Sequence, residues 1–167
     1  MPNKTEETNA VRQVRHQPAK LDEVDRKILG LLAADSSQSY AELSAILHLS
    51  APSVHDRVKR LKRDGVIQAT VAKIDGCKVG RTLLTFVLVN TKNVMSTKRL
   101  LTLSSLPEIE EIHTVTGDSS VMLKVRAQST ERLEELLGKV QDIDGVEGTR
   151  SYVVLSTFIE RGPDPRL

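Results

Sequence analysis

The sequence has few cysteines and no long apolar run. Its single cysteine, Cys77, cannot form an internal disulfide, which is typical of proteins from a reducing compartment. Since no CxxC pattern or nearby histidine accompanies it, we expect an inert thiol. No apolar run approaches the roughly 20 residues of a membrane-spanning helix, and residues 1–20 lack the apolar stretch of a signal peptide. We therefore expect a cytoplasmic protein with no membrane partner.

The motifs of catalytic and metal sites are also missing. The sequence contains no HxxxH, HExxH, GxSxG or Walker-type pattern. Its carboxylate pairs, such as Glu110-Glu111, are adjacent in sequence, so that their side chains diverge. We expect no catalytic residue, no metal site and no cofactor.

Aromatic residues make up 2% of the chain and there is no tryptophan, so that any core must consist mainly of Leu, Val and Ile. Lys and Arg number 24 against 22 Asp and Glu, a net charge of only +2. A nucleic-acid surface would therefore have to come from local clustering. Such a cluster exists: five basic residues lie within 57–63, namely Arg57, Lys59, Arg60, Lys62 and Arg63.

Residues 21–75 predict three helices. Asp22 is a plausible N-cap of the first, Ser39 with Glu42 forms a capping box for the second, and Ser50 caps the third. The third helix ends at Asp64-Gly65, where Gly is a favourable residue. Apolar residues at helical spacing predict the buried faces. They are Val24, Ile28, Leu31 and Leu32 in the first helix, Leu43, Ile46 and Leu47 in the second, and Val54, Val58 and Leu61 in the third.

Two short helices joined by a tight turn, the second of them basic, are typical of a DNA-binding helix-turn-helix. The alternating β-branched residues of 66–75 predict the strand of a wing. With its apolar residues inward, the third helix directs Pro52, Asp56, Lys59, Arg60 and Arg63 outward. The residues expected to contact double-stranded DNA are Ser50, Pro52, Ser53, His55, Asp56, Lys59, Arg60, Arg63 and Gln68.

The rest of the chain predicts a second domain. Residues 76–80 form a linker, 81–160 follow the order βαββαβ of a ferredoxin-like domain, and 161–167 form a tail. We expect the first helix to begin at Ser96, the second to be capped by Thr130, and a tight turn at Gly117-Asp118. The fold class is therefore α+β, a winged helix-turn-helix followed by this domain. Residues 1–20 are expected to be a disordered polar arm, solvated or in contact with phosphates.

Both helices of a βαββαβ domain cover one face of the sheet and leave the other open. The strand at 83–89 is apolar on both alternations, and "YVVL" at 152–155 does not alternate either. An apolar open face marks an interaction surface, most often a two-fold homodimer. The sequence does not decide which of two sets of alternate residues faces the partner. The sets are Leu84, Phe86 and Leu88 or Leu83, Val87 and Val89.

These stretches resemble a known family. "LDEVDRKILGLLAADSSQSYAELSAILHLSAPSVHDRVKRLKRDGVI", "EIEEIHTVTGD…VMLKV" and "DGVEGTRSYVVL" resemble the leucine-responsive regulatory protein/AsnC family of transcription regulators over about residues 21–160. The resemblance implies a regulator that binds palindromic DNA sites, assembles as dimers or octamers, and binds a small amino-acid effector. Mapped onto this sequence, the effector residues are Gly117, Asp118, Ser119, Ser120, Thr149 and Ser151.

One turn departs from the family pattern. The family has Gly-Asp, any residue, Asp and an aromatic; here the turn is "GDSSV", with Ser120 in place of the second Asp and Val121 in place of the aromatic. The loss of a carboxylate removes a charge-assisted hydrogen bond to an ammonium group, so we expect a weaker or different effector, or a plain β-turn. Two other functions stay open. Sirohaem decarboxylases resemble the same two-domain fold, and a structural oligomer would bind DNA without sequence preference.

Overall fold

The computed structural model describes residues 18–166, so that the prediction for the N-terminal arm lies almost wholly outside the described residues. The chain divides into two compact units: one contains the described residues up to Val71 together with the C-terminal residues from Arg161, and the other is Ala72–Glu160. Each unit has its own hydrophobic core. The predicted domain bounds, with a linker at 76–80, stay a prediction.

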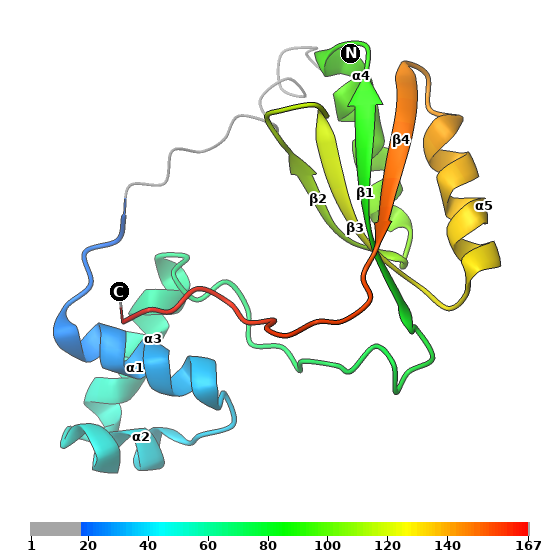
Figure 1. Cartoon of the computed structure of the whole chain (residues 1–167). Coiled ribbons are helices and arrows are strands. Elements are labelled where there is room, and N and C mark those ends of the chain that lie inside the picture. Colours follow the sequence, from blue (N-terminus) through cyan, green and yellow to red (C-terminus); the bar gives the residue numbers. More distant parts are fainter. Residues whose placement is uncertain (1–17, 167) are drawn as a thin grey trace, which may run out of the picture. The chain divides into compact units, whose positions relative to one another are not determined.

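The first unit contains the three predicted helices, α1 (Glu23–Ala34), α2 (Tyr40–Leu47) and α3 (Ala51–Arg63) (Figure 1). Each begins where its cap was predicted: Asp22 and Ser39 form complete capping boxes, and the Ser50 hydroxyl accepts from the backbone N–H of Ser53. Gly65 follows α3 with φ +72°, the left-handed conformation that favours glycine after a helix. Short polar caps therefore set the helix starts.

The core of this unit consists of one or more buried residues from each helix: Ile28, Leu43, Val54, Val58 and Leu61. The prediction that Ile46 is buried is wrong, because its side chain is 53% exposed. Successive residues turn about 100° around a helix, so that Leu47 stays within about 40° of the buried Leu43, whereas Ile46 lies about 60° away on the other side. In a helix of eight residues the packed face is narrow.

The predicted wing strand at 66–75 is not formed. Val66 and Ile67 donate backbone hydrogen bonds to the carbonyl of Leu61 and pack against the core, but the first strand of the described chain begins only at Leu83. A strand needs a partner for its backbone hydrogen bonds, and no described segment of the first unit supplies one. The alternation of β-branched residues was therefore insufficient to predict a strand.

The second unit has the predicted order of elements. These are β1 (Leu83–Thr91), α4 (Val94–Arg99), the 3₁₀ helix η2 (Leu100–Ser105), β2 (Ile109–Thr114), β3 (Val121–Ala127), α5 (Thr130–Gln141) and β4 (Val146–Val153). The strands form one antiparallel sheet in the order β2-β3-β1-β4. Two predicted starts are wrong by one or two residues, because α4 begins at Val94 rather than Ser96, and Ser129 rather than Thr130 caps α5.

The two faces of the sheet are clearly distinguished. Val87 and Val89 of β1 are fully buried in a core that also contains residues of η2 and α5, which lie on the same side of the sheet (Figure 1). The alternate residues of β1, Leu84, Phe86 and Leu88, are on the opposite side, which we call the open face. The structure therefore decides which of the two sets of alternate residues faces away from the helices, a choice that the sequence did not determine.

The open face is only partly apolar. Lys124 of β3 lies within 3.4 Å of Glu110 and within 3.1 Å of Glu111, and Arg126 donates to Glu110. The expectation of a largely apolar open face is therefore too simple: an apolar stripe on β1 lies beside a ladder of ion pairs on β2 and β3. Each of these charged side chains has an oppositely charged neighbour, and this pairing offsets the cost of removing the charges from water where other residues cover them.

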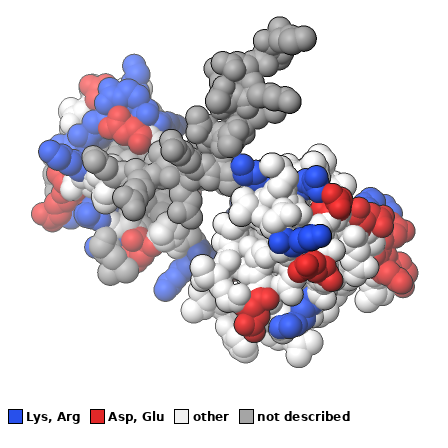
Figure 2. Space-filling model, turned by 90° about the horizontal axis from the view of Figure 1, so that it is seen from above, with Lys and Arg blue, Asp and Glu red and all other residues white. Residues whose placement is uncertain are grey.

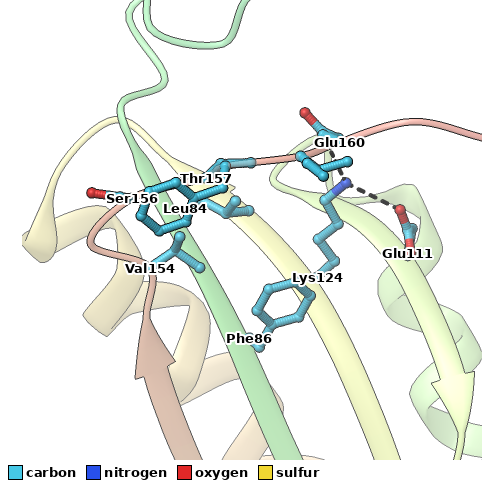
Figure 3. A pocket seen from close by; sticks show the side chains of 10 residues that line it. Leu84, Phe86, Glu111, Lys124, Val154, Ser156, Thr157 and Glu160 are labelled. Carbon is cyan, nitrogen blue, oxygen red and sulfur yellow. Dashed lines mark hydrogen bonds and ion pairs between the residues drawn. The ribbon is translucent and has the colours of Figure 1, made fainter.

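Residues 154–160, which we call the crossing segment, run from the end of β4 across the open face. Val154 donates to the carbonyl of Leu84 on β1, and Glu160 accepts from Lys124 on β3 at 2.9 Å (Figure 3). A cavity of about 440 Å³ lies between this segment and the sheet, lined by Phe86 among others. β4 ends at Val153, and the crossing segment leaves the sheet after it.

Candidate functional site

The exposed side of α3 carries most of the residues predicted to contact DNA. Pro52, His55, Asp56, Lys59 and Arg63 are all exposed. Of the remaining predicted residues, Ser50 and Gln68 are exposed, whereas Ser53 and Arg60 are half-buried. The structure therefore brings the N-terminal turns of α3 and its later cations onto one accessible helix surface.

The N-terminal end of α3 is held by α2. The ring of Tyr40, the first residue of α2, contacts the ring of His55 edge to face at 5.2 Å. His55 also lies 3.4 Å from the carboxylate of Asp56. Residues at the N-terminal end of a recognition helix are those that reach base edges in the major groove, and the contact between Tyr40 and His55 lies at that end of α3.

Two of the five clustered cations are held by α1. Arg57 donates to Asp22 at 2.6 Å and to Asp25 at 2.8 Å, and Arg60 donates to Asp25 at 2.5 Å. Asp25 itself is 0% exposed. The predicted outward orientation is therefore wrong for Arg60, whose guanidinium turns back toward α1.

This network changes the titration of its members. The hydrogen bond from Arg57 lowers the pKa of the Asp22 carboxyl below its ordinary value, and the hydrogen bonds to Asp22 and Asp25 raise the pKa of Arg57. The role of Asp25 as the partner of two arginines was not predicted from the sequence. The three-residue spacing of Arg57 and Arg60 was the available signal, since residues three apart share one side of a helix.

The face of the protein shown in Figure 2 carries Lys and Arg as well as Asp and Glu. Since the net charge of the whole chain is only +2, electrostatic attraction for DNA depends on a local group of cations. On α3 that group consists of Lys59, Lys62 and Arg63, all exposed.

The predicted effector turn lies between β2 and β3. Gly117 has φ +123°, and the N–H of Val115 donates to the carbonyl of Ser120 at 3.0 Å, which closes the turn. The hydroxyl of Ser120 accepts from the backbone N–H of Thr91 at 3.3 Å. Ser120 is therefore engaged in joining the turn to β1, whereas Asp118 is exposed and carries the only carboxylate of the turn.

Thr149 and Ser151 lie on β4 and do not adjoin the turn within one chain. Thr149 is opposite Val89 of β1, which is opposite Val121 of β3. Since neighbouring strands are about 4.8 Å apart, Thr149 lies two strand spacings, or roughly 10 Å, from the start of β3. Its hydroxyl is hydrogen-bonded to Gln141 of α5. The structure thus brings residues 117–120 together and leaves the two β4 residues apart from them.

Residues 18–166 lack two further features. None of the helices there is long and apolar enough to cross a membrane. In the same residues no three side chains of His, Cys, Asp or Glu are grouped closely enough to hold a metal ion.

Two family models match the sequence. Residues 21–68 match a winged helix-turn-helix DNA-binding domain, and residues 84–164 match the Lrp/AsnC ligand binding domain. The first match covers α1 to α3, and the second covers the sheet and α5 as well as the crossing segment.

Several curated proteins and solved structures are similar to this chain over more than four fifths of its length. The HTH-type transcriptional regulator FL11 of Pyrococcus horikoshii is 36% identical over 140 residues, which are 84% of this chain and 93% of that protein. The HTH-type transcriptional regulator LrpA of Mycobacterium tuberculosis is 34% identical, over 83% of this chain and 92% of its own. Among structures, that of AsnC from E. coli has a TM-score of 0.82 at 30% identity and covers 88% of this chain and 100% of its own.

Proposed function

The chain belongs to the Lrp/AsnC family of DNA-binding transcription regulators, and from this premise we propose that it reads palindromic sites as a dimer or a higher oligomer, such as an octamer. In this proposal, residues 21–75 read double-stranded DNA, 76–80 are the linker, and 81–160 assemble the oligomer and bind an effector. The regulator acts in the cytoplasm.

The observation that carries the DNA-binding proposal is the exposed surface of α3. A capped helix after a tight turn exposes Pro52, His55 and Asp56 near its start and Lys59 and Arg63 further along. The early residues are placed to reach base edges, and the later cations to contact phosphates. The remaining proposed contacts flank this surface and are Ser50, Ser53 and Gln68. Arg60 is not included among the contacts, because it is held by Asp25.

For assembly we propose that the open face of one chain packs against that of a second copy. Leu84, Phe86 and Leu88 form an apolar stripe on β1 opposite the side covered by helices. The crossing segment already covers Leu84, which is 8% exposed, so that the part of the stripe left for a second copy consists of Phe86 and Leu88, both half-buried. Apolar surface on an open antiparallel sheet is stabilised when it is buried. A two-fold dimer would also supply two copies of α3, as a palindromic site requires.

For regulation we propose that a small amino acid binds at residues 117–120, and that Thr149 and Ser151, which lie apart from this turn within one chain, line the site where a second copy brings them to it. The backbone N–H groups of the turn suit an α-carboxylate, because they need no particular side chain. Ser120 lacks the negative charge that would pair with the α-ammonium group and already accepts from Thr91. We therefore expect weaker effector binding than an acidic residue there would give, by about 1.5–3 kcal/mol.

Selection of genomic DNA fragments tests the DNA-binding function. Purified protein is incubated with sheared genomic DNA, bound fragments are sequenced, and recovered sites are compared with scrambled duplexes of the same composition. The proposal expects enrichment of sites with two-fold symmetry. Equal affinity for selected and scrambled duplexes would instead favour a structural oligomer that retains the fold.

Calorimetric titration with each of the twenty amino acids tests the effector site. The native chain is compared with a Ser120→Asp variant, which restores a carboxylate. Weak binding that is strengthened by the variant supports the proposal. Tight binding by the native chain with no gain in the variant would show that another group accepts the ammonium, and no binding by either would favour regulation without an effector.

A further inference from the structure

The buried carboxylate of Asp25 stands out in the first unit, because it lies on α1, which supplies none of the proposed DNA contacts. From its contacts we infer that Asp25 is a positioning residue for DNA recognition: together with the core contacts of α3 it sets the rotation of that helix, and it withdraws Arg57 and Arg60 from the DNA phosphates. The inference rests on the proposed DNA-binding function and adds which residues position the helix and which cations are left to bind.

Both oxygens of Asp25 are occupied. Oδ1 accepts from Arg57 at 2.8 Å, and Oδ2 accepts from Arg60 at 2.5 Å and from the backbone N–H of Asp22 at 3.2 Å. The N–H of Asp25 in turn donates to Asp22 at 2.7 Å, which fixes the carboxylate to the first turn of α1. The acceptor is therefore rigid on the α1 side.

The α3 side of the network is held at two points. Arg57 and Arg60 are three residues apart, about one turn of the helix, and so lie on the same flank of α3. A helix tied at two points along one flank resists rotation about its own axis, which a single contact would not prevent. The rotation of α3 decides which side chains face a DNA groove, and Lys59, between the two arginines in sequence, lies exposed on the outward side.

The network also divides the five clustered cations into two groups. Arg57 and Arg60 have a buried carboxylate as partner, whereas Lys59, Lys62 and Arg63 are exposed on α3, where the carboxylate that pairs with Arg63, Asp64 at 3.0 Å, is itself exposed. DNA affinity falls with salt by about 0.9 log units per log unit of salt for each phosphate neutralised. The slope contributed by α3 should therefore reflect three cations rather than five.

A purely stabilising role for the network is the alternative. Buried ion pairs are often no better for stability than apolar residues of the same size, so that stability alone does not account for placing two arginines and an aspartate here. The two roles differ in one measurable way. Loss of a stabilising contact weakens binding to all DNA alike, whereas loss of positioning weakens binding to the specific site and frees two cations for phosphates.

The test compares Asp25→Asn with the native chain on a duplex recovered by the fragment selection and on a scrambled duplex, over about 50–200 mM salt. We expect affinity for the selected duplex to fall by about tenfold or more. On the scrambled duplex, affinity should be unchanged or higher, with a slope steeper by up to about 1.8, or 0.9 for each released arginine. Asp35→Asn, which removes the same charge at the other end of α1, should change neither the affinity for either duplex nor the salt slope.

Arg57→Gln and Arg60→Gln supply a second test that does not depend on the folding of Asp25→Asn. Each should weaken binding to the selected duplex and leave the salt slope unchanged, whereas Arg63→Ala should lower the slope by about 0.9. The inference is overturned if either glutamine variant lowers the slope as Arg63→Ala does, or if Asp25→Asn weakens both duplexes equally with no change of slope. A native chain that does not discriminate between the duplexes would overturn the proposed function, and the slopes on scrambled DNA would still show which cations reach phosphates.

Discussion

Lys59 and Arg60 are neighbours in sequence with different surroundings. Lys59 is exposed on the outward side of α3, whereas Arg60 has a side chain 40% exposed and donates to the buried Asp25. Both count equally in a sum of charges, but an arginine with a buried carboxylate partner is already neutralised. The number of cations available to DNA is therefore set by a residue on another helix, more than thirty positions earlier.

Lys59 and Arg63 should differ in their effect on DNA binding. Replacing Lys59 with Ala should weaken binding to the selected site by about 1–3 kcal/mol if its ammonium reaches a base edge. Replacing Arg63 with Ala should weaken binding to all sequences alike and flatten the salt dependence, because a phosphate contact carries no sequence information. Fluorescence anisotropy with selected and scrambled duplexes measures both. If both variants bind the selected duplex as the native chain does, the groove assignment of α3 is wrong.

At the scale of elements, β1 separates two environments by alternation alone. Val87 is fully buried against the helix layer, and its neighbour Phe86 points to the open face. Because side chains alternate along a strand, adjacent substitutions report on different surfaces. The pair is therefore a matched test of core against interface.

Phe86→Asp should yield a folded monomer, and Val87→Asp should prevent folding. A charge on the open face opposes its burial between two copies, whereas an unpaired carboxylate within the core costs several kcal/mol. Light scattering gives the mass of each variant, and circular dichroism gives its folded fraction. A monomeric native chain would contradict the proposed interface, and so would a Phe86→Asp variant that keeps the native mass.

The crossing segment should be stabilised by charge at neutral pH and loosened in acid. The hydrogen bond from Lys124 lowers the pKa of the Glu160 carboxyl below its ordinary value of 4.5. A lowered pKa means that the contribution to stability is complete above pH 4.5 and is lost as the pH falls through the lowered value. Glu160→Gln should therefore be less stable than the native chain at pH 7, by up to about 1 kcal/mol because the carboxylate is partly exposed.

Thermal unfolding of the native chain and of Glu160→Gln, from pH 7 to pH 3, measures the difference in stability between them. It should shrink as the pH falls below 4.5 and vanish once Glu160 is protonated. Glu147→Gln, at an exposed glutamate of β4, is the control and should not show it. A difference that stays constant with pH would show that the lost stability does not come from the charge of Glu160.

Local signals predicted those elements that depend on local contacts. Ser39 and Ser50 set helix starts through hydrogen bonds to residues three positions away, and such caps are visible in the sequence. The wing strand at 66–75 was predicted wrongly because a strand depends on a partner that is distant in sequence. The effector residues illustrate the same limit, since Thr149 and the turn at 117–120 are brought near or kept apart only by the order of the strands.

At the scale of the whole molecule, the proposed dimer joins two helix-turn-helix units through two sheets. Each unit has its own core, with Ile28 and Leu43 in one and Val87 and Leu123 in the other. A change that disrupts assembly need not disrupt the reading unit. The separation of cores therefore allows DNA affinity and assembly to be measured independently in one chain.

Spacing of the two half-sites should govern binding by the native protein. If two copies of α3 bind one palindrome, their half-sites lie about 10–10.5 base pairs apart, or a multiple of this, on one side of the duplex. Inserting about five base pairs places the half-sites on opposite sides and should lower affinity, whereas inserting about ten should restore much of it. Mobility-shift titrations with the three duplexes measure the effect. The monomeric Phe86→Asp variant should bind all three duplexes equally and weakly, because it has a single copy of α3. Insensitivity of the native chain to spacing would show that its reading units engage DNA independently, and the dimeric arrangement proposed for the site would be wrong.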